Sequence, residues 1–257
     1  MSSIEKNIRE LNRLQDLQQR SHWMNDLHPL GKLLTSALYI FLVASINKYD
    51  LVSLILMSVY LVFAFLIGEL SLKEGLYRMR LIIPLVVFIG IFNPFFDKDI
   101  VLYVGSIGVS GGVLSMITIF IKGMYSVLSA YVLIATTSID DICYALRVIK
   151  VPKIIVIVIM LIYRYFDVMA LEAQRITTAY SLRAPSQKGI HYKAWGALVG
   201  QWLLRSMDRA EMVYESMLLR GFNGEFAFKK RKLKPADIIY PVVWACILVV
   251  IKLRIIF

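Results

Sequence analysis

The chain contains several apolar segments whose lengths approach the roughly 20 helical residues needed to cross a lipid bilayer. These segments lie at about 30–46, 51–67, 80–93, 113–137 and 237–256. Hydrophobic residues make up 58% of the 257-residue chain, whereas a typical soluble domain is roughly 45–50% apolar. The sequence therefore predicts an all-α, polytopic helical membrane protein with about five transmembrane helices in a lipid bilayer.

Basic residues in the predicted loops indicate the orientation of the chain. Membrane proteins collect Lys and Arg in their cytoplasmic loops, which accounts for the net charge of +11 without nucleic-acid binding. Arg78 and Arg80 follow the second apolar segment and place that loop inside the cell. We therefore expect a multi-pass protein of the cell (plasma) membrane with a cytoplasmic N-terminus and no nucleic-acid partner.

The apolar run 154–163 is the ambiguous part of this topology. Arg164 and Asp167 cut the run short, and a charge at mid-bilayer costs ~2.5–3.5 kcal/mol. A full crossing here would also put the many basic residues between Arg175 and Lys234 outside the cell, against the positive-inside rule. We therefore expect five spans, with six as the alternative, and expect the run to pack at the cytoplasmic membrane interface.

The sequence accordingly divides into four parts. Residues 1–29 form an N-terminal amphipathic cytoplasmic segment, 30–137 hold transmembrane helices 1–4, 138–236 form a cytoplasmic coupling-helix domain, and 237–257 form a C-terminal transmembrane helix. Apolar residues at helical spacing in the first part predict a helix on the membrane surface or on a partner, or else a solvated amphipathic tail. Because charges interleave with these apolar residues, we expect no cleavable signal sequence.

Two arginines stand at predicted helix ends in the basic part of the chain. Arg183 comes just before Ala184-Pro185, and Arg220 comes just before Gly221. A helix tends to end before a proline, and glycine is favoured just after a helix end, so each arginine is expected in the last turn of a helix. A cation in the last turn of a helix is favourable by ~0.3–1 kcal/mol, so one interpretation is that both arginines only stabilise helix ends. The other is that each guanidinium reaches carboxylates or carbonyls of a partner. Two such ends suit a partner that is itself a dimer.

The helices that lead to these arginines are predicted from apolar residues at helical spacing. The stripes are Met169, Ala173, Ile176 and Tyr180 on the first helix, and Leu203, Met207, Ala210, Tyr214 and Met217 on the second. Ser138 is predicted to cap a shorter helix that ends before Pro152. Ser71 and Glu74 fit a capping box at the start of another.

The stretch 151–226 resembles the transmembrane (T) component of energy-coupling factor transporters, the CbiQ/EcfT family. The matching pieces are Val151-Pro152, Arg164-Tyr165-Phe166, Glu172-Ala173-Gln174-Arg175-Ile176, Leu182-Arg183-Ala184, Arg205-Ser206-Met207-Asp208-Arg209-Ala210 and Met217-Leu218-Leu219-Arg220-Gly221-Phe222. His28-Pro29-Leu30-Gly31-Lys32-Leu33 is also similar to the family's usual Asp-Pro-Arg-x-Lys-Leu, so the resemblance covers nearly the whole chain.

This sequence departs from the family pattern at its first arginine motif. That motif reads Leu-Arg-Ala around Arg183, where the family usually has Ala-Arg-Gly, whereas the Leu-Arg-Gly around Arg220 is closer. The run Leu218-Leu219-Arg220-Gly221-Phe222-Asn223-Gly224 is most like the cobalt-type CbiQ subgroup.

The resemblance implies a scaffold and coupling subunit of an ABC importer. In this family, two cytoplasmic ATP-binding (ABC ATPase) subunits each receive one arginine-tipped helix, and ATP-driven closure moves the helices. The membrane body then reorients a separate substrate-binding membrane (S) component, which releases cobalt, nickel or a vitamin inside. The implied ATPase-docking residues are Arg183, Arg220, Leu182, Ala184, Leu219 and Gly221. On this resemblance the chain is not an enzyme and holds no cofactor or metal.

Lys122 is a further candidate because it lies in the middle of the fourth apolar segment. A charge within a membrane span indicates function by default, so Lys122 is a possible intramembrane contact to a partner subunit, or to a carboxylate such as Glu69. The alternative is that its ammonium group snorkels to the surface or is buried inside the bundle. Gly196 and Gly200 form a lone small-residue pair, for which ordinary helix packing is the better interpretation.

Two other classes of protein compete with the transporter subunit. An integral membrane enzyme acting on lipids or isoprenoids would need clustered acids or histidines, but Asp140-Asp141 has no second acidic cluster at a useful spacing. A channel or secondary carrier would need internal repeats and polar residues along several spans. The chain also lacks a phosphate-binding loop, so we do not expect it to be its own ATPase.

Overall fold

The computed structural model describes residue 18 and residues 22–80, 83–96, 100–104, 107–185, 189–226 and 234–253. These residues belong to two compact units. We call residues 18–145 and 234–253 the bundle unit, and residues 146–226 the hairpin unit. The predicted N-terminal amphipathic helix, with its apolar residues at 4–14, lies outside the described residues.

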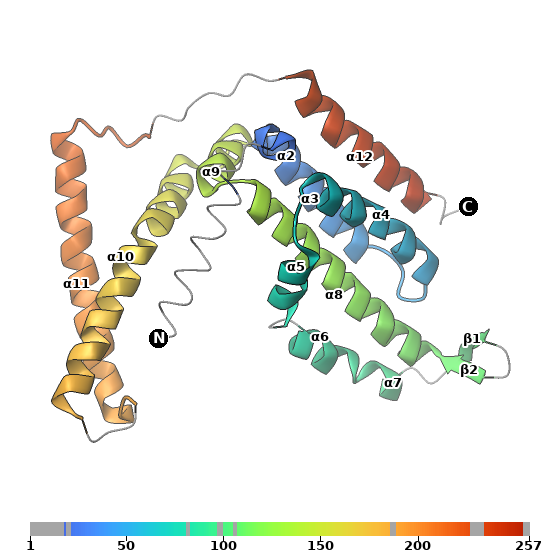
Figure 1. Ribbon diagram of the computed structural model, residues 1–257, viewed down its shortest axis with the longest axis horizontal. Coiled ribbons are helices and arrows are strands. Elements are labelled where there is room, and N and C mark those ends of the chain that lie inside the picture. The colour runs from blue at the N-terminus through green and yellow to red at the C-terminus, as the bar shows by residue number, and fades with distance from the viewer. Residues whose placement is uncertain are drawn as a thin grey trace. The chain divides into compact units, whose positions relative to one another are not determined.

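Four long helices make up most of the bundle unit (Figure 1). They are α3 (Pro29–Ala44), α4 (Leu51–Ile67), α8 (Gly111–Thr136) and α12 (Pro235–Leu253), after a single turn α2 (Trp23–Asp26). Each long helix begins and ends within three residues of a predicted apolar segment. Local chemistry explains the two starts that are best defined. The Nδ1 atom of His28 accepts the N–H of Leu30 at α3, and the Asp50 carboxylate accepts the N–H of Ser53 at α4.

The predicted third span at 80–93 is wrong as a single helix. This part of the chain forms α5 (Leu72–Met79), α6 (Ile83–Gly90) and the one-turn α7 (Asn93–Phe96). With eight residues, α6 is about 12 Å long, far short of a bilayer core of about 30 Å. Ser71 does precede α5, but its side chain makes no capping hydrogen bond, so the predicted capping box is also wrong.

A small antiparallel hairpin joins these short helices to α8. It consists of β1 (Ile100–Val104) and β2 (Ile107–Ser110), in the glycine-containing segment that follows the third apolar run. Apart from this hairpin the described chain is helical, which confirms the predicted all-α membrane class.

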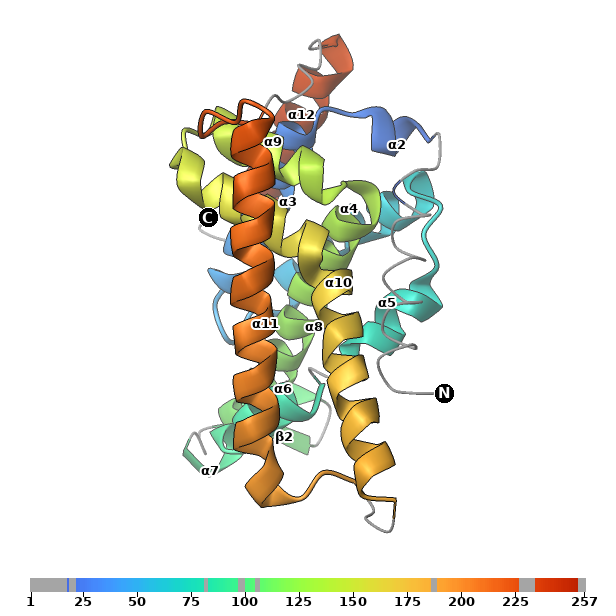
Figure 2. The same ribbon diagram turned by 90° about the vertical axis from the view of Figure 1, so that its left-hand side faces the viewer.

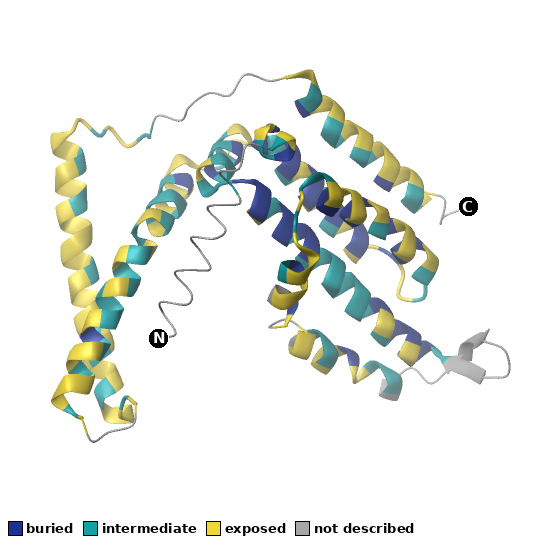
Figure 3. Cartoon of the chain, viewed as in Figure 1, coloured by how far each residue is buried: buried dark blue, intermediate teal, exposed yellow. Residues whose placement is uncertain are grey.

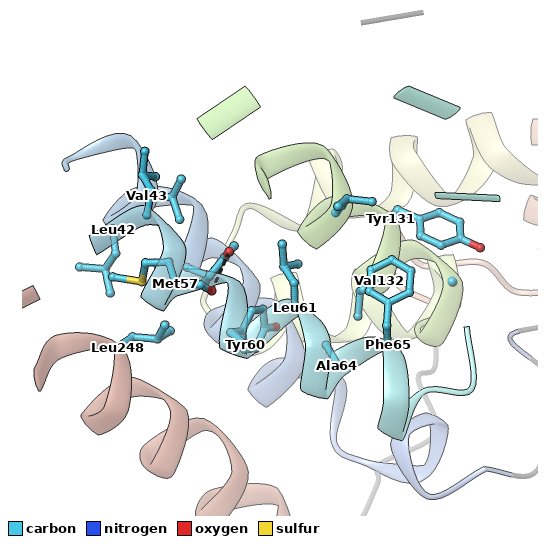
Figure 4. Packing of buried hydrophobic residues seen from close by; sticks show 14 of the residues in the cluster. Leu42, Val43, Met57, Tyr60, Leu61, Ala64, Phe65, Tyr131, Val132 and Leu248 are labelled. Atoms are coloured by element: carbon cyan, nitrogen blue, oxygen red, sulfur yellow. Dashed lines mark hydrogen bonds between the residues drawn. The ribbon is translucent and has the colours of Figure 1, made fainter. Parts of the chain in front are cut away.

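The core of the bundle unit lies where its long helices meet. α3 and α4 each pack against both α8 and α12, and Figure 3 shows their buried residues on the facing sides. Figure 4 shows Tyr60 and Phe65 of α4 among these buried side chains. The Tyr60 ring lies 4.6 Å from that of Tyr39 and 5.0 Å from that of Trp244. Aromatic groups therefore tie α3, α4 and α12 together.

The hairpin unit contains two long antiparallel helices. The chain enters it through α9 (Ile139–Val148) and continues into α10 (Lys153–Arg183) and α11 (Tyr192–Leu219). Figure 2 shows α10 and α11 side by side. The run 154–163 and the helix predicted after it are one continuous 31-residue helix. The N-terminal cap of α9 is as predicted, because the Ser138 hydroxyl accepts the N–H of Asp141 at 3.2 Å.

Three of the described helices are long and apolar enough to cross a bilayer, namely α8, α10 and α12. α3 and α4 are apolar but shorter. α10 is one of these three helices because its apolar first half does not end at Arg164. The helix continues without a break through Asp167 and Glu172 and is 31 residues long.

Candidate functional site

The two candidate arginines occupy helix ends, as the breakers after them predict. Arg183 is the last residue of α10, and the N–H of Ala184 donates to the carbonyl oxygen of Tyr180 at 3.1 Å. Arg220 is the residue just after α11. Gly221 follows with a φ of +79°, a left-handed conformation that glycine adopts without strain.

Both arginines are exposed, and each follows an exposed leucine. Leu182 is 77% exposed and Leu219 is 90% exposed. A leucine side chain that is this exposed contributes little to the stability of the isolated chain. It contributes favourable free energy to binding when a partner buries it. Within the described part of the chain, neither Arg183 nor Arg220 makes an ion pair. Each helix end therefore presents a guanidinium and an adjacent apolar side chain to the outside.

The structure does not bring the two arginines together. The N–H of His191, just before α11, donates to the Tyr180 hydroxyl near the end of α10 at 3.3 Å. Arg183 therefore lies by the start of α11, whereas Arg220 lies at its end. The 28 residues of α11 make a helix about 42 Å long. The candidate residues form two separate tips at opposite ends of the hairpin.

Polar contacts that sequence reasoning missed hold the hairpin together. Glu172 of α10 pairs with Arg205 of α11, and also with Arg175 one turn along its own helix at 3.3 Å. The indole N–H of Trp202 donates to the carbonyl oxygen of Met169 at 3.2 Å. Glu172 and Arg205 were both quoted in the family motifs, but the sequence alone does not show that they face each other.

Apolar grooves flank the contact between α10 and α11. One groove is lined from α10 by Ile157, Leu161, Tyr165 and Met169, and from α11 and the turn after it by Met217 and Phe222, among others. A second groove lies on the other flank, where Trp202 and Leu203 face Phe166. The predicted apolar stripes therefore line these grooves and do not form a closed core. Within the stripes Ile176 is buried, whereas Leu203 is exposed. Gly196 and Gly200 have no atoms near where a side chain would start, so they mark no close helix contact.

A second missed cluster lies at the end of α11. The Glu225 carboxylate accepts from Arg147 Nη2 at 2.8 Å, and it also pairs with Lys153. Arg147 Nη1 donates to the carbonyl oxygen of Phe226 at 3.2 Å. No motif in the sequence indicates this cluster, because Glu225 lies 78 residues from Arg147 and 72 residues from Lys153 along the chain.

In the bundle unit, Lys122 is bound to a helix end. Its Nζ donates to the carbonyl oxygen of Ala44 at 3.1 Å and to that of Ile46. These are carbonyls that the last turn of α3 leaves without a helical partner. Glu69, the suggested carboxylate partner, instead lies 3.8 Å from His22 Nε2. Lys122 therefore has backbone partners in place of Glu69.

Lys32, which was quoted in the family motif, has a matching arrangement. It is only 3% exposed, and its Nζ donates to the carbonyl oxygen of Thr136 at 2.7 Å, where α8 ends. Among the described residues no group of three or more His, Cys, Asp or Glu side chains is placed to hold a metal ion.

Comparison with known proteins identifies the family. Residues 20–231 match the family model of CbiQ, described as a cobalt transport protein. An uncharacterized protein of Methanocaldococcus jannaschii is 27% identical over 218 residues, which cover 79% of this chain and 74% of that protein. A second uncharacterized protein of the same organism is 31% identical over 91 residues, covering 35% of this chain and 34% of that protein. With most of its length matched, the chain belongs to the CbiQ family of cobalt transport proteins.

Proposed function

We propose that the chain is the coupling subunit of an energy-coupling factor ABC importer whose cargo is cobalt, or else nickel or a vitamin. Two cytoplasmic ATPase subunits dock on the tips at Arg183 and Arg220, and a separate membrane subunit binds the cargo. The chain transmits the movement of the ATPases to that subunit. The family that the chain belongs to is described by transport, in agreement with this role.

The observation that carries this proposal is the pair of helix tips. Each has an exposed arginine at a helix end and an exposed leucine beside it. A guanidinium forks onto carboxylates or carbonyls with defined geometry, and a neighbouring leucine adds apolar contact. The alternative interpretation, in which the arginines only stabilise their own helix ends, gives no reason for Leu182 and Leu219 to be exposed next to them.

The orientation and the remaining partner complete the proposal. The hairpin unit faces the cytoplasm together with the N-terminus, in agreement with the basic residues of 138–236. This orientation needs an even number of crossings before residue 138, so the divided segment that contains α6 and α7 has to cross between α4 and α8 as a broken span. Residues 237–257 then cross the membrane once more. The apolar grooves beside α10 and α11 support binding of the separate cargo subunit, since such grooves gain free energy when another apolar helix covers them.

Co-purification tests the docking. The chain is expressed with a candidate ATPase pair, and retention of the pair is compared between the native chain and the double variant Arg183→Glu, Arg220→Glu. We expect the double variant to lose the ATPase pair. Arg164→Glu is the matched control, since it makes the same change at an exposed position of α10 that lines neither groove and lies away from both tips.

The control and the double variant must both elute as folded protein in detergent and show native helical circular dichroism. If the double variant retains the ATPase pair as fully as Arg164→Glu does, the docking proposal is wrong. Single variants then rank the tips, and Arg220→Glu is expected to have the larger effect because its motif is closer to the family's.

A further inference from the structure

The segment that follows the Arg220 tip begins with a tight turn. Gly221 and Gly224 have φ angles of +79° and +83°, left-handed conformations that glycine adopts without strain. The N–H of Phe222 donates to the carbonyl oxygen of Met217 at 3.0 Å, and the rings of Phe222 and Phe226 lie 5.1 Å apart. The position of Arg220 is therefore linked to that of the whole turn 221–226.

Glu225 fixes this turn to a different part of the hairpin unit. Its two carboxylate oxygens bind different cations, Arg147 in the last turn of α9 and Lys153 at the first residue of α10. Arg147 also donates to the carbonyl oxygen of Phe226. We call Glu225, Arg147 and Lys153 the clip. Its three contacts join two regions that are distant in sequence.

The clip lies where the chain passes between the two units. The boundary between the units falls between Ala145 and Leu146 within α9, just before Arg147, and the compact unit that contains the hairpin ends at Lys230, five residues after Glu225. The clip therefore holds both ends of the hairpin unit together at one place. Apart from the clip, apolar side chains bring these two regions together, since Phe222 lines the same groove as Ile157 near the start of α10.

The charges and the exposure of the clip residues suit them to fix the position of the turn 221–226. The side chains of Arg147 and Glu225 are each about one-third exposed, at 33% and 38%. A single pair at such a site contributes little to stability, but two cations and a backbone acceptor on one turn define its place geometrically. By contrast, no ion pair holds the described residues between Arg183 and α11, which are 184–185 and 189–191.

We infer that Glu225 is a positioning residue that clips the start and the end of the hairpin unit together, so that the unit moves as one lever when its tips are pulled. The inference rests on the proposed function, because the lever has a purpose only if ATPases bind the tips. A pull on Arg220 then reaches α9 directly through the turn 221–226 and the clip.

Spin-label distances test the clip in the protein by itself. Nitroxides are attached at Ile149→Cys and Ser216→Cys, in a background in which Cys143 and Cys246 are serine, and the protein is placed in liposomes. We expect one narrow distance distribution in the otherwise native chain. Glu225→Gln should broaden it, whereas the matched control Glu215→Gln, an exposed residue of α11, should leave it unchanged. An unchanged distribution in Glu225→Gln overturns the inference.

The same labels test the lever once the ATPase pair is bound. Trapping the ATPases closed with ATP and vanadate should leave the Ile149–Ser216 distance unchanged in the clipped chain, since a rigid lever moves as a whole. In Glu225→Gln the same closure should shift the distance. A shift in the clipped chain overturns the lever. Failure of the native chain to retain the ATPase pair overturns the proposed function instead, and the liposome experiment still decides whether the clip exists.

Discussion

Lys32 and Lys122 each cap the C-terminal end of the other's helix. Lys32 of α3 donates to the last carbonyl of α8, and Lys122 of α8 donates to the carbonyls that end α3. The C-terminal end of a helix carries partial negative charge and unpaired carbonyls, so each ammonium group is both neutralised and hydrogen-bonded. This reciprocal arrangement locks the axial position of α3 against α8.

Removing either lysine should therefore destabilise the bundle. Lys32→Met leaves the Thr136 carbonyl without its ammonium donor in a buried site, for which we expect a loss of about 1–3 kcal/mol. Lys122→Met should cost less, because Lys122 is less buried. Thermal unfolding in detergent measures both, with Lys73→Met, an exposed lysine of α5, as the control. Equal melting temperatures for Lys32→Met and the control would contradict the capping role.

Glycine substitutions should have opposite effects in the two units. A Cβ at Gly31 would lie 3.1 Å from the carbonyl oxygen of Asp237, in the contact between α3 and α12. We expect Gly31→Ala to destabilise the protein by about 1–3 kcal/mol as the helices are pushed apart. Gly200→Ala meets open space within α11 and should stabilise that helix by up to about 1 kcal/mol. Urea unfolding in detergent, followed by circular dichroism, measures the two signs.

The buried thiol of Cys143 should react slowly. Burial raises the pKa of the Cys143 thiol, and the charge of Asp140 raises the pKa further. The reactive thiolate is therefore scarce at neutral pH, and its fraction increases only as the pH rises towards that pKa. In the Cys246→Ser variant we expect alkylation of Cys143 at pH 7 to be on the order of tenfold slower than that of an unfolded-chain thiol. Mass spectrometry of maleimide adducts over a pH series checks this, and rapid alkylation of the folded protein at pH 7 would refute it.

The exposed leucine at the second tip should matter for binding and not for folding. Leu219→Ser removes an apolar side chain that the isolated chain leaves 90% exposed, so its melting temperature should be native. Its affinity for the ATPase pair should fall about ten- to a hundredfold, since burying a leucine contributes about 1.5–3 kcal/mol. Surface plasmon resonance with immobilised chain measures the affinity, and Met212→Ser, at another exposed apolar residue of α11, provides the control. A lower melting temperature in Leu219→Ser alone would show that the side chain supports the fold.

The parts of the fold that sequence reasoning predicted well are those set by local patterns. The long apolar helices follow from their composition, and Arg183 and Arg220 are at helix ends because a proline and a glycine end those helices. Ser138 caps α9 because its hydroxyl reaches an N–H three residues on. Each of these features depends on residues within one or two turns of one another.

The predictions that failed depend on tertiary structure. The third apolar run has the composition of a membrane span, yet it is divided between the short helices α6 and α7. Pro84 and Pro94 are each the second residue of one of these helices, a position at which proline favours the start of a helix. α10 runs without a break through Arg164 and Asp167, which the sequence presented as an end to the apolar segment. The partners of Lys32, Lys122 and Glu225 lie about 70 to 100 residues away, and no local pattern indicates contacts of that range.

The length of α11 sets a fixed spacing that any bound partner has to match. An uninterrupted helix resists stretching and bending, so the separation of its ends is nearly constant through a working cycle. The two binding sites of a dimeric protein can occupy both tips only when the distance between the sites equals the distance between the tips. Lengthening α11 by two whole turns would change this separation and would also draw Glu225 away from Arg147 and Lys153, so under the proposed function the native length selects dimers with the matching spacing.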